Sequence, residues 1–126
     1  MPHYLLQASY NPEAWAALAR EPEDRTEAIK PIIERLGGEV IAGYLSFGEY
    51  DIVAIVEMPG SVEVAAYAIS SAGGGAVRVH KTTPLLTPEE SQQAMALAGQ
   101  AEYHAPHALQ QAMAHEAADL VAAVGE

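Results

Sequence analysis

Residues 51–56 read Asp-Ile-Val-Ala-Ile-Val, and this run decides how the rest of the chain can fold. Its apolar side chains occupy consecutive positions, whereas a strand with one solvated face alternates apolar and polar residues. We therefore expect a strand that is covered on both faces. Helices of the same chain can cover one face, but a chain of 126 residues needs a partner subunit for the other. The run predicts a homodimer or higher homo-oligomer that pairs through its sheet.

Turn and cap residues around this run predict the other elements. Asn11-Pro12 and Ser61 are typical of helix starts, whereas Gly37-Gly38 and Gly73-Gly74-Gly75 are typical of helix ends. We expect strands at 4–10, 39–46, 50–58 and 76–83, and helices at 13–19, 22–36 and 61–72. This is the β-α-β-β-α-β order of an α+β, ferredoxin-like fold.

Prolines add detail to this outline. Pro22 falls in the first turn of the second expected helix, where proline is tolerated. Pro31 falls inside that helix, where it removes a hydrogen bond and should bend the axis. Pro84 and Pro88 bracket an expected turn after the last strand.

The composition disfavours several kinds of partner. Six Lys and Arg against seventeen Asp and Glu give a formal charge of −11, which repels nucleic acid and anionic membrane surfaces. The absence of cysteine excludes disulfides and thiolate chemistry. The start, Met1-Pro2-His3-Tyr4, resembles no secretory leader, and no apolar run reaches the length of a membrane span. We expect a cytoplasmic protein with neither a nucleic-acid nor a membrane partner.

Residues 96–126 read as a C-terminal helical extension of a domain at 1–95. A helix is expected from Thr87 to Ala98, and another from about Pro106 with an apolar stripe at Leu109, Met113, Leu120 and Val124. Residues 82–126 hold six acidic and no basic residues. We expect this extension to dock on the dimer; the alternative is that it recruits another protein.

The stretch Gly48-Glu49-Tyr50-Asp51-Ile52-Val53 resembles the signature of the GYD-domain family, which belongs to the dimeric α/β-barrel superfamily. Three further segments look like family landmarks: Asn11-Pro12-Glu13, Leu36-Gly37-Gly38 and Thr87-Pro88-Glu89. The resemblance covers about residues 1–95, whereas Pro31 and the extension depart from the pattern. It implies two facing four-stranded sheets, with small molecules bound at the dimer interface or between sheet and helices. Relatives in the superfamily include monooxygenases, haem-degrading enzymes and amino-acid-binding domains, so the fold does not fix the function.

Tyr50 and Asp51 lie at the exit of the expected hairpin, where a polar side chain can point into a cleft. Asp51 could serve as a base or a hydrogen-bond acceptor for a ligand, with Tyr50 beside it. Alternatively, Asp51 holds the turn by accepting from backbone amides, and Tyr50 packs at the end of the barrel.

His80 is the second candidate catalytic residue, because one face of the last strand carries polar groups. Arg78, His80 and Thr82 alternate there with Val77, Val79 and Lys81, and His80 could shuttle a proton near neutral pH. We expect it to meet Gln7 or Ser9 from the first strand and Tyr44 from the second. Alternatively, this face lies at a sheet edge and meets solvent.

The extension contains His104, His107 and His115, but we expect no metal and no cofactor. His107 and His115 lie two helical turns apart, about 12 Å along the axis, which is too far to share one ion. A solvated polar face is the preferred interpretation.

Three functions follow from these observations. The leading one is a homodimer that binds a small, partly apolar molecule in a cleft lined by Tyr44, Tyr50, Asp51 and His80. The second is a cofactor-independent enzyme of the monooxygenase or proton-transfer type, with His80 or Asp51 as base. The third is a scaffold that recruits a protein through its acidic C-terminal helix. A deep pocket with an ionisable group of displaced pKa would favour the enzyme, and an apolar cleft without one would favour binding.

Overall fold

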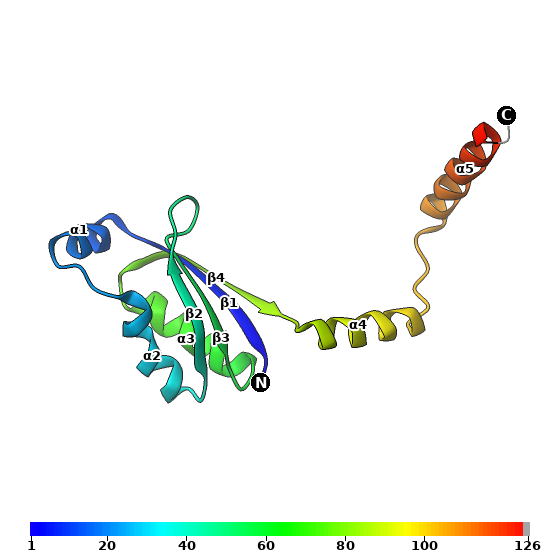
Figure 1. Cartoon of the computed structure of the whole chain (residues 1–126). Coiled ribbons are helices and arrows are strands. Elements are labelled where there is room, and N and C mark those ends of the chain that lie inside the picture. The colour runs from blue at the N-terminus through cyan, green and yellow to red at the C-terminus, as the bar shows by residue number, and fades with distance from the viewer. Residues whose placement is uncertain (125–126) are drawn as a thin grey trace. The chain divides into compact units, whose positions relative to one another are not determined.

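A computed structural model describes residues 1–124 and confirms the expected α+β fold. The elements are β1 (His3–Tyr10), α1 (Pro12–Arg20), α2 (Arg25–Arg35), β2 (Glu39–Leu45), β3 (Ile52–Glu57), α3 (Ser61–Gly73), β4 (Val77–Leu85), α4 (Pro88–Gln100) and α5 (His107–Val124) (Figure 1). The chain divides into two compact units, Met1–Pro88 and Glu89–Glu126.

The first unit is built on a four-stranded antiparallel sheet in the order β2-β3-β1-β4. The central strand β1 pairs with β3 on one side and with β4 on the other. Residues directly opposite each other on neighbouring strands share a face of the sheet, and successive residues alternate between faces. The register therefore assigns each strand residue to one of two faces.

One face of the sheet carries the core beneath α2 and α3 (Figure 1). Leu6 and Ala54 stand opposite each other in the register, as do Tyr4 and Val56. All four are buried, and they cluster with four residues of the two helices, namely Ile29, Ile33, Val64 and Tyr67. Ile29 and Ile33 of α2 thus face the sheet.

The other face of the sheet, which we call the open face, has apolar residues at its centre, with Gln7, Lys81 and Thr83 beside them. Leu5 stands opposite Ile55, and Val53 stands between Tyr44 and Gln7. Leu5, Val53 and Ile55 are partly exposed, while Tyr44 is 69% exposed. The consecutive apolar run of β3 thus serves two faces, of which the helices α2 and α3 cover one.

The first-turn predictions for two helices are wrong. Helix α2 begins at Arg25, because the side chain of Asp24 accepts from the Glu27 amide and caps the helix. Pro22 therefore precedes α2 and belongs to the loop after α1. At α3 the cap residue is Gly60, without a side-chain hydrogen bond, and Ser61 is already helical.

Pro31 lies inside α2, as expected, and the helix continues to Arg35. One other proline and a glycine differ from expectation. Pro84 lies within β4 and not in a turn, which an edge strand tolerates because its outer amides need no partner. Gly99 lies within α4 and does not end it.

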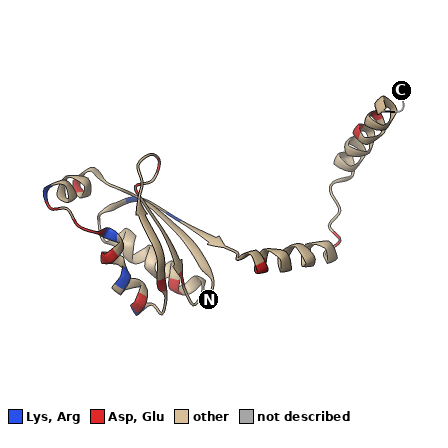
Figure 2. Cartoon of the chain, viewed as in Figure 1, with Lys and Arg blue, Asp and Glu red and all other residues tan. Residues whose placement is uncertain are grey.

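The second unit contains the expected pair of helices, α4 and α5. Neither has a buried residue among those described, and exposed apolar side chains include Met95, Leu109 and Leu120. Its charged side chains are acidic, with no Lys or Arg (Figure 2). Among residues 1–124, no helix combines the length and the hydropathy that crossing a bilayer would require.

The turn from α2 into β2 depends on glycine at two positions. Gly37 adopts a φ of +86°, which favours glycine after a helix. The Gly38 amide donates to the Ile33 carbonyl at 3.0 Å. A Cβ atom at Gly38 would collide with the Glu57 carbonyl oxygen and the Met58 sulfur. This turn has no room for a side chain, because the backbone of β3 runs directly beside it.

We predict that Gly38→Ala lowers the free energy of unfolding by about 1–3 kcal/mol, because the added methyl overpacks the core. Gly99→Ala is the control, since a Cβ atom there meets nothing within 4 Å and alanine favours a helix. Urea denaturation followed by circular dichroism measures both variants. Equal unfolding midpoints for Gly38→Ala and the parent chain would contradict the close contact.

Candidate functional site

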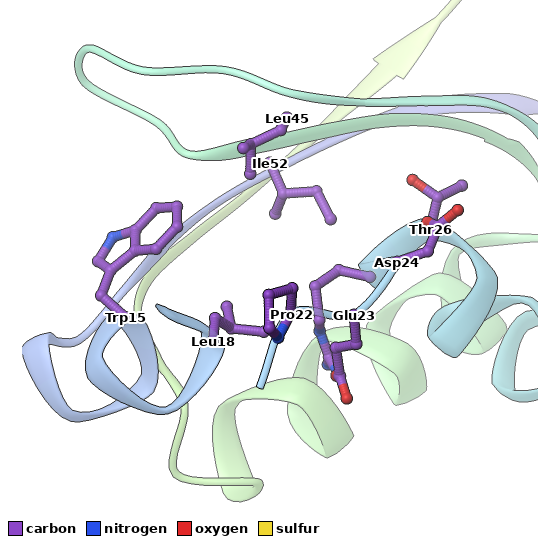
Figure 3. Close-up of a pocket in the computed structure, with 9 residues that line it drawn as sticks. Trp15, Leu18, Pro22, Glu23, Asp24, Thr26, Leu45 and Ile52 are labelled. Atoms are coloured by element: carbon purple, nitrogen blue, oxygen red, sulfur yellow. The ribbon is translucent and has the colours of Figure 1, made fainter. Parts of the chain in front are cut away.

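The main hollow of the first unit lies where α1, the loop after it and the start of α2 meet the ends of β2 and β3. Its volume is about 280 Å³. Trp15 and Leu18 of α1 form one wall, and Leu45 and Ile52 of the strands form another (Figure 3). The remaining lining residues belong to the loop and the start of α2: Pro22, Glu23, Asp24, Arg25 and Thr26. We call this hollow the α1 pocket.

The break between α1 and α2 creates the α1 pocket. Helix α1 ends at Arg20, and α2 starts only after the Asp24 cap, so a non-helical segment separates the two helices. A continuous helix would have packed side chains against this end of the sheet at regular intervals. The short loop instead leaves the apolar ends of β2 and β3 facing a hollow.

Asp51 holds Trp15 in the wall of the pocket. Its Oδ2 atom accepts from the Tyr10 amide at 2.9 Å and from the Trp15 indole nitrogen at 3.2 Å. The Tyr10 and Trp15 rings meet edge to face, with centroids 5.4 Å apart. The Asp51 amide in turn donates to the Ala8 carbonyl at 2.9 Å. Asp51 therefore fastens the β2–β3 loop to β1 and α1, which agrees with the turn-holding alternative and extends it to the indole.

Arg25 provides the positive charge of the α1 pocket. Its side chain is 32% exposed and pairs with the Glu23 carboxylate, while its Nε atom is buried without a hydrogen-bond partner among the described residues. Burial opposes the charge, but hydrogen bonds with Glu23 and Tyr10 favour it, and the pKa of Arg25 is raised. The guanidinium therefore stays charged.

Two further hollows also reach Arg25. One, of about 240 Å³, lies beside α1 and is lined by Tyr10, Leu18 and Ala76 among others. The other, of about 170 Å³, lies between α2 and α3 and includes Tyr67. Arg25 thus stands where three hollows adjoin.

His80 lies half-buried on the edge strand β4, against Tyr67 of α3, and not in the α1 pocket. Its ring meets Tyr67 edge to face, with centroids 5.8 Å apart, beside a void of about 20 Å³. Such a void holds about one water molecule. Burial lowers the pKa of His80 and raises that of Tyr67, so both are neutral near pH 7.

The expected polar pocket of His80 with Gln7, Ser9 and Tyr44 is wrong in its geometry. His80 stands opposite Ala8, on the helix-covered face, whereas Gln7 and Tyr44 flank Val53 on the open face. In a strand, one residue of difference in register moves a side chain to the other face. The proposed groups are therefore divided by the sheet itself.

The remaining candidates also lie apart. Ser9 is buried, and its hydroxyl donates to the Glu49 carbonyl at 2.7 Å. Arg78 is exposed and has no partner position on β1, because the register shifts there. The Tyr50 carbonyl accepts from the Ser46 hydroxyl at 2.7 Å, within the loop between β2 and β3. A role for these residues in ligand binding stays a prediction.

The histidines of the second unit form no evident centre. His115 lies 3.6 Å from the Asp119 carboxylate, and both side chains are largely exposed. Throughout residues 1–124, no three His, Asp or Glu side chains gather closely enough to hold a metal ion.

Sequence reasoning missed Arg25 and the role of Trp15 in a pocket. One signal was present: Asp24 is a typical cap residue, and a cap there would have placed Arg25 at the start of a helix beside the loop. The indole contact with Asp51, however, joins residues 36 positions apart. No local pattern announces such a contact.

Comparison with known proteins identifies one family. The model of the GYD domain matches residues 4–95 of this chain. Searches of curated proteins and of solved structures each returned no match.

We predict that Asp51→Ala frees the Trp15 indole and lowers the free energy of unfolding by about 1–3 kcal/mol, because it leaves the partly buried Tyr10 amide unpaired. The emission should shift to the red because the freed indole becomes more exposed to water. The signal reports on Trp15 alone, since it is the only tryptophan of the chain. Glu49→Ala is the matched control, because it changes an exposed carboxylate in the same loop. An Asp51→Ala emission identical to that of the parent chain would show that the indole is held by other contacts.

Proposed function

The chain belongs to the GYD-domain family, and we propose a binding function for it: a homodimer that holds a small, partly apolar molecule in the α1 pocket of each subunit. The observation that carries this proposal is the pocket itself. Its volume of about 280 Å³ lies just below the range for drug-sized ligands, and its walls are apolar with a few polar groups at one side. The expected compartment is the cytoplasm.

Binding is favoured over catalysis because His80, the histidine whose pKa is shifted, does not line the α1 pocket. His80 is half-buried and adjoins a void with room for about one water molecule, which is too small to hold a substrate. Asp51 is occupied by the Tyr10 amide and the Trp15 indole. A general base needs hydrogen-bond reach of a substrate proton, and neither residue offers that arrangement.

The open face of the sheet supports the dimer. Leu5, Val53 and Ile55 form its centre, and Tyr44 lies at its edge with 69% of its surface exposed. A contiguous apolar surface of this kind marks an interface more often than a free surface. A second copy is the occupant that we propose, because the chain resembles dimeric α/β-barrel proteins, in which two sheets face each other.

We predict a particle of twice the mass of one chain at micromolar concentration, measured by light scattering. Ile55→Glu should give a monomer, because it buries a charge at the centre of the interface. Tyr44→Glu tests the same face at a site that is exposed in the single subunit. Ile69→Glu is the control, since Ile69 is 73% exposed on α3. A monomeric parent chain would overturn the dimer.

We predict that cyclohexylmethanol, a small neutral molecule, binds saturably and changes the emission of Trp15. Leu18→Gln should abolish the change, because Leu18 lines the α1 pocket. Val62→Gln should not, because Val62 is 77% exposed on α3 and lines none of the hollows described above. A linear, unsaturable response, or the same response in Leu18→Gln, would count against a binding pocket at this place.

A further inference from the structure

We propose that the ligand of the α1 pocket carries a carboxylate, and that Arg25 binds it in the place that the Glu23 carboxylate occupies in the free protein. This inference rests on the proposed binding function and adds the chemical class of the ligand. It concerns a residue that no sequence motif singles out.

Arg25 stands alone as a cation at this site. It lines the α1 pocket and both adjoining hollows, and no other Lys or Arg lines any of the three. About two thirds of its side chain is covered, since 32% is exposed. A cation that is partly withdrawn from water has its electrostatic interactions screened less than one at the surface.

The guanidinium has donors that the protein does not use. A guanidinium group presents five N–H donors in a planar fork that fits a carboxylate with two parallel hydrogen bonds. Nη1 pairs with Glu23, whereas Nε is buried without a partner among the described residues. A buried donor without an acceptor destabilises its state. Because Nε has almost no exposed surface in the free protein, the Arg25 side chain must turn before a ligand carboxylate can reach Nε, and the new hydrogen bond would then remove this cost.

Glu23 shows that a carboxylate fits on Arg25 and that this carboxylate can leave. It belongs to the loop between α1 and α2 and lies two residues from Arg25 in sequence. Its side chain is 51% exposed, and an ion pair of such exposure adds little to stability. The Glu23 side chain can therefore rotate into the solvent when a ligand binds whose carboxylate replaces it and whose hydrocarbon part fills the pocket.

The surroundings select a monocarboxylate over a phosphate. Glu23 and Asp24 both line the α1 pocket, and the whole chain carries a formal charge of −11. This negative field repels a dianion more strongly than a monoanion. The apolar walls of Trp15, Leu45 and Ile52 suit a ring or a short branched chain. The ligand class is a small carboxylic acid with a compact hydrocarbon body.

The test compares three probes of one shape on the full chain. Cyclohexanecarboxylate, cyclohexanecarboxamide and cyclohexylphosphonate are titrated at pH 8 while the emission of Trp15 is recorded. We expect the carboxylate to bind at least tenfold more tightly than either other probe, a difference of about 1.4 kcal/mol. Arg25→Met should remove the preference over the amide, and Glu23→Gln should tighten carboxylate binding. Arg25→Lys, which keeps the charge without the fork, should retain part of the preference.

The outcomes separate this inference from the function on which it rests. Equal binding of carboxylate and amide, or unchanged carboxylate affinity in Glu23→Gln, overturns the carboxylate site and leaves the apolar pocket standing. Phosphonate binding as tight as that of the carboxylate overturns the choice of ligand class. No binding of these probes or of cyclohexylmethanol overturns both proposals. If Arg25→Met fails to fold by circular dichroism, Glu23→Gln and Arg25→Lys still decide the matter.

Discussion

The structure depends on one constraint: the sheet carries apolar residues on both faces, but its helices cover only one of them. Helices α2 and α3 follow from the β-α-β-β-α-β order, and both pack on the same face above Leu6 and Val56. The other face keeps Leu5, Val53 and Ile55 at its centre. Apolar burial is the main stabilising term in folding and association, so the open face is where this chain has most to gain from a partner.

The same constraint locates the candidate site. The short helix α1 lies near the end of the sheet, and the loop after it leaves the ends of β2 and β3 incompletely covered. Asp51 fixes this arrangement by joining the β2–β3 loop to Tyr10 and Trp15. Asp51, the carboxylate of the family-like signature, thus positions Trp15 in the wall of the α1 pocket. Its importance is structural, although it borders the place where we propose that a ligand binds.

The charge of Arg25 determines which kind of ligand the site favours. The chain is strongly acidic, and its second unit has no cation at all (Figure 2). Against this background one partly buried guanidinium at the meeting point of three hollows is conspicuous. Its partner Glu23 neutralises it without using all of its donors. A site of this kind is poised between an internal ion pair and an external one, and a ligand with both a carboxylate and an apolar body can shift that balance.

The sequence by itself determined the order of the elements and the α+β class, because apolar periodicity and Gly or Pro signals act over a few residues. The family followed from the resemblance of residues 48–53 to its signature. It missed the start of α2, where the Asp24 cap overrode the first-turn preference of Pro22. It also placed His80 with Gln7 and Tyr44, since the faces of a strand pair depend on a register that distant residues set. Only the tertiary structure decided that His80 lies on the helix-covered face, that Asp51 holds Trp15, and that Arg25 faces the hollows. The physical reason is that each of these features depends on contacts between segments that are far apart in the sequence and meet only in the folded chain.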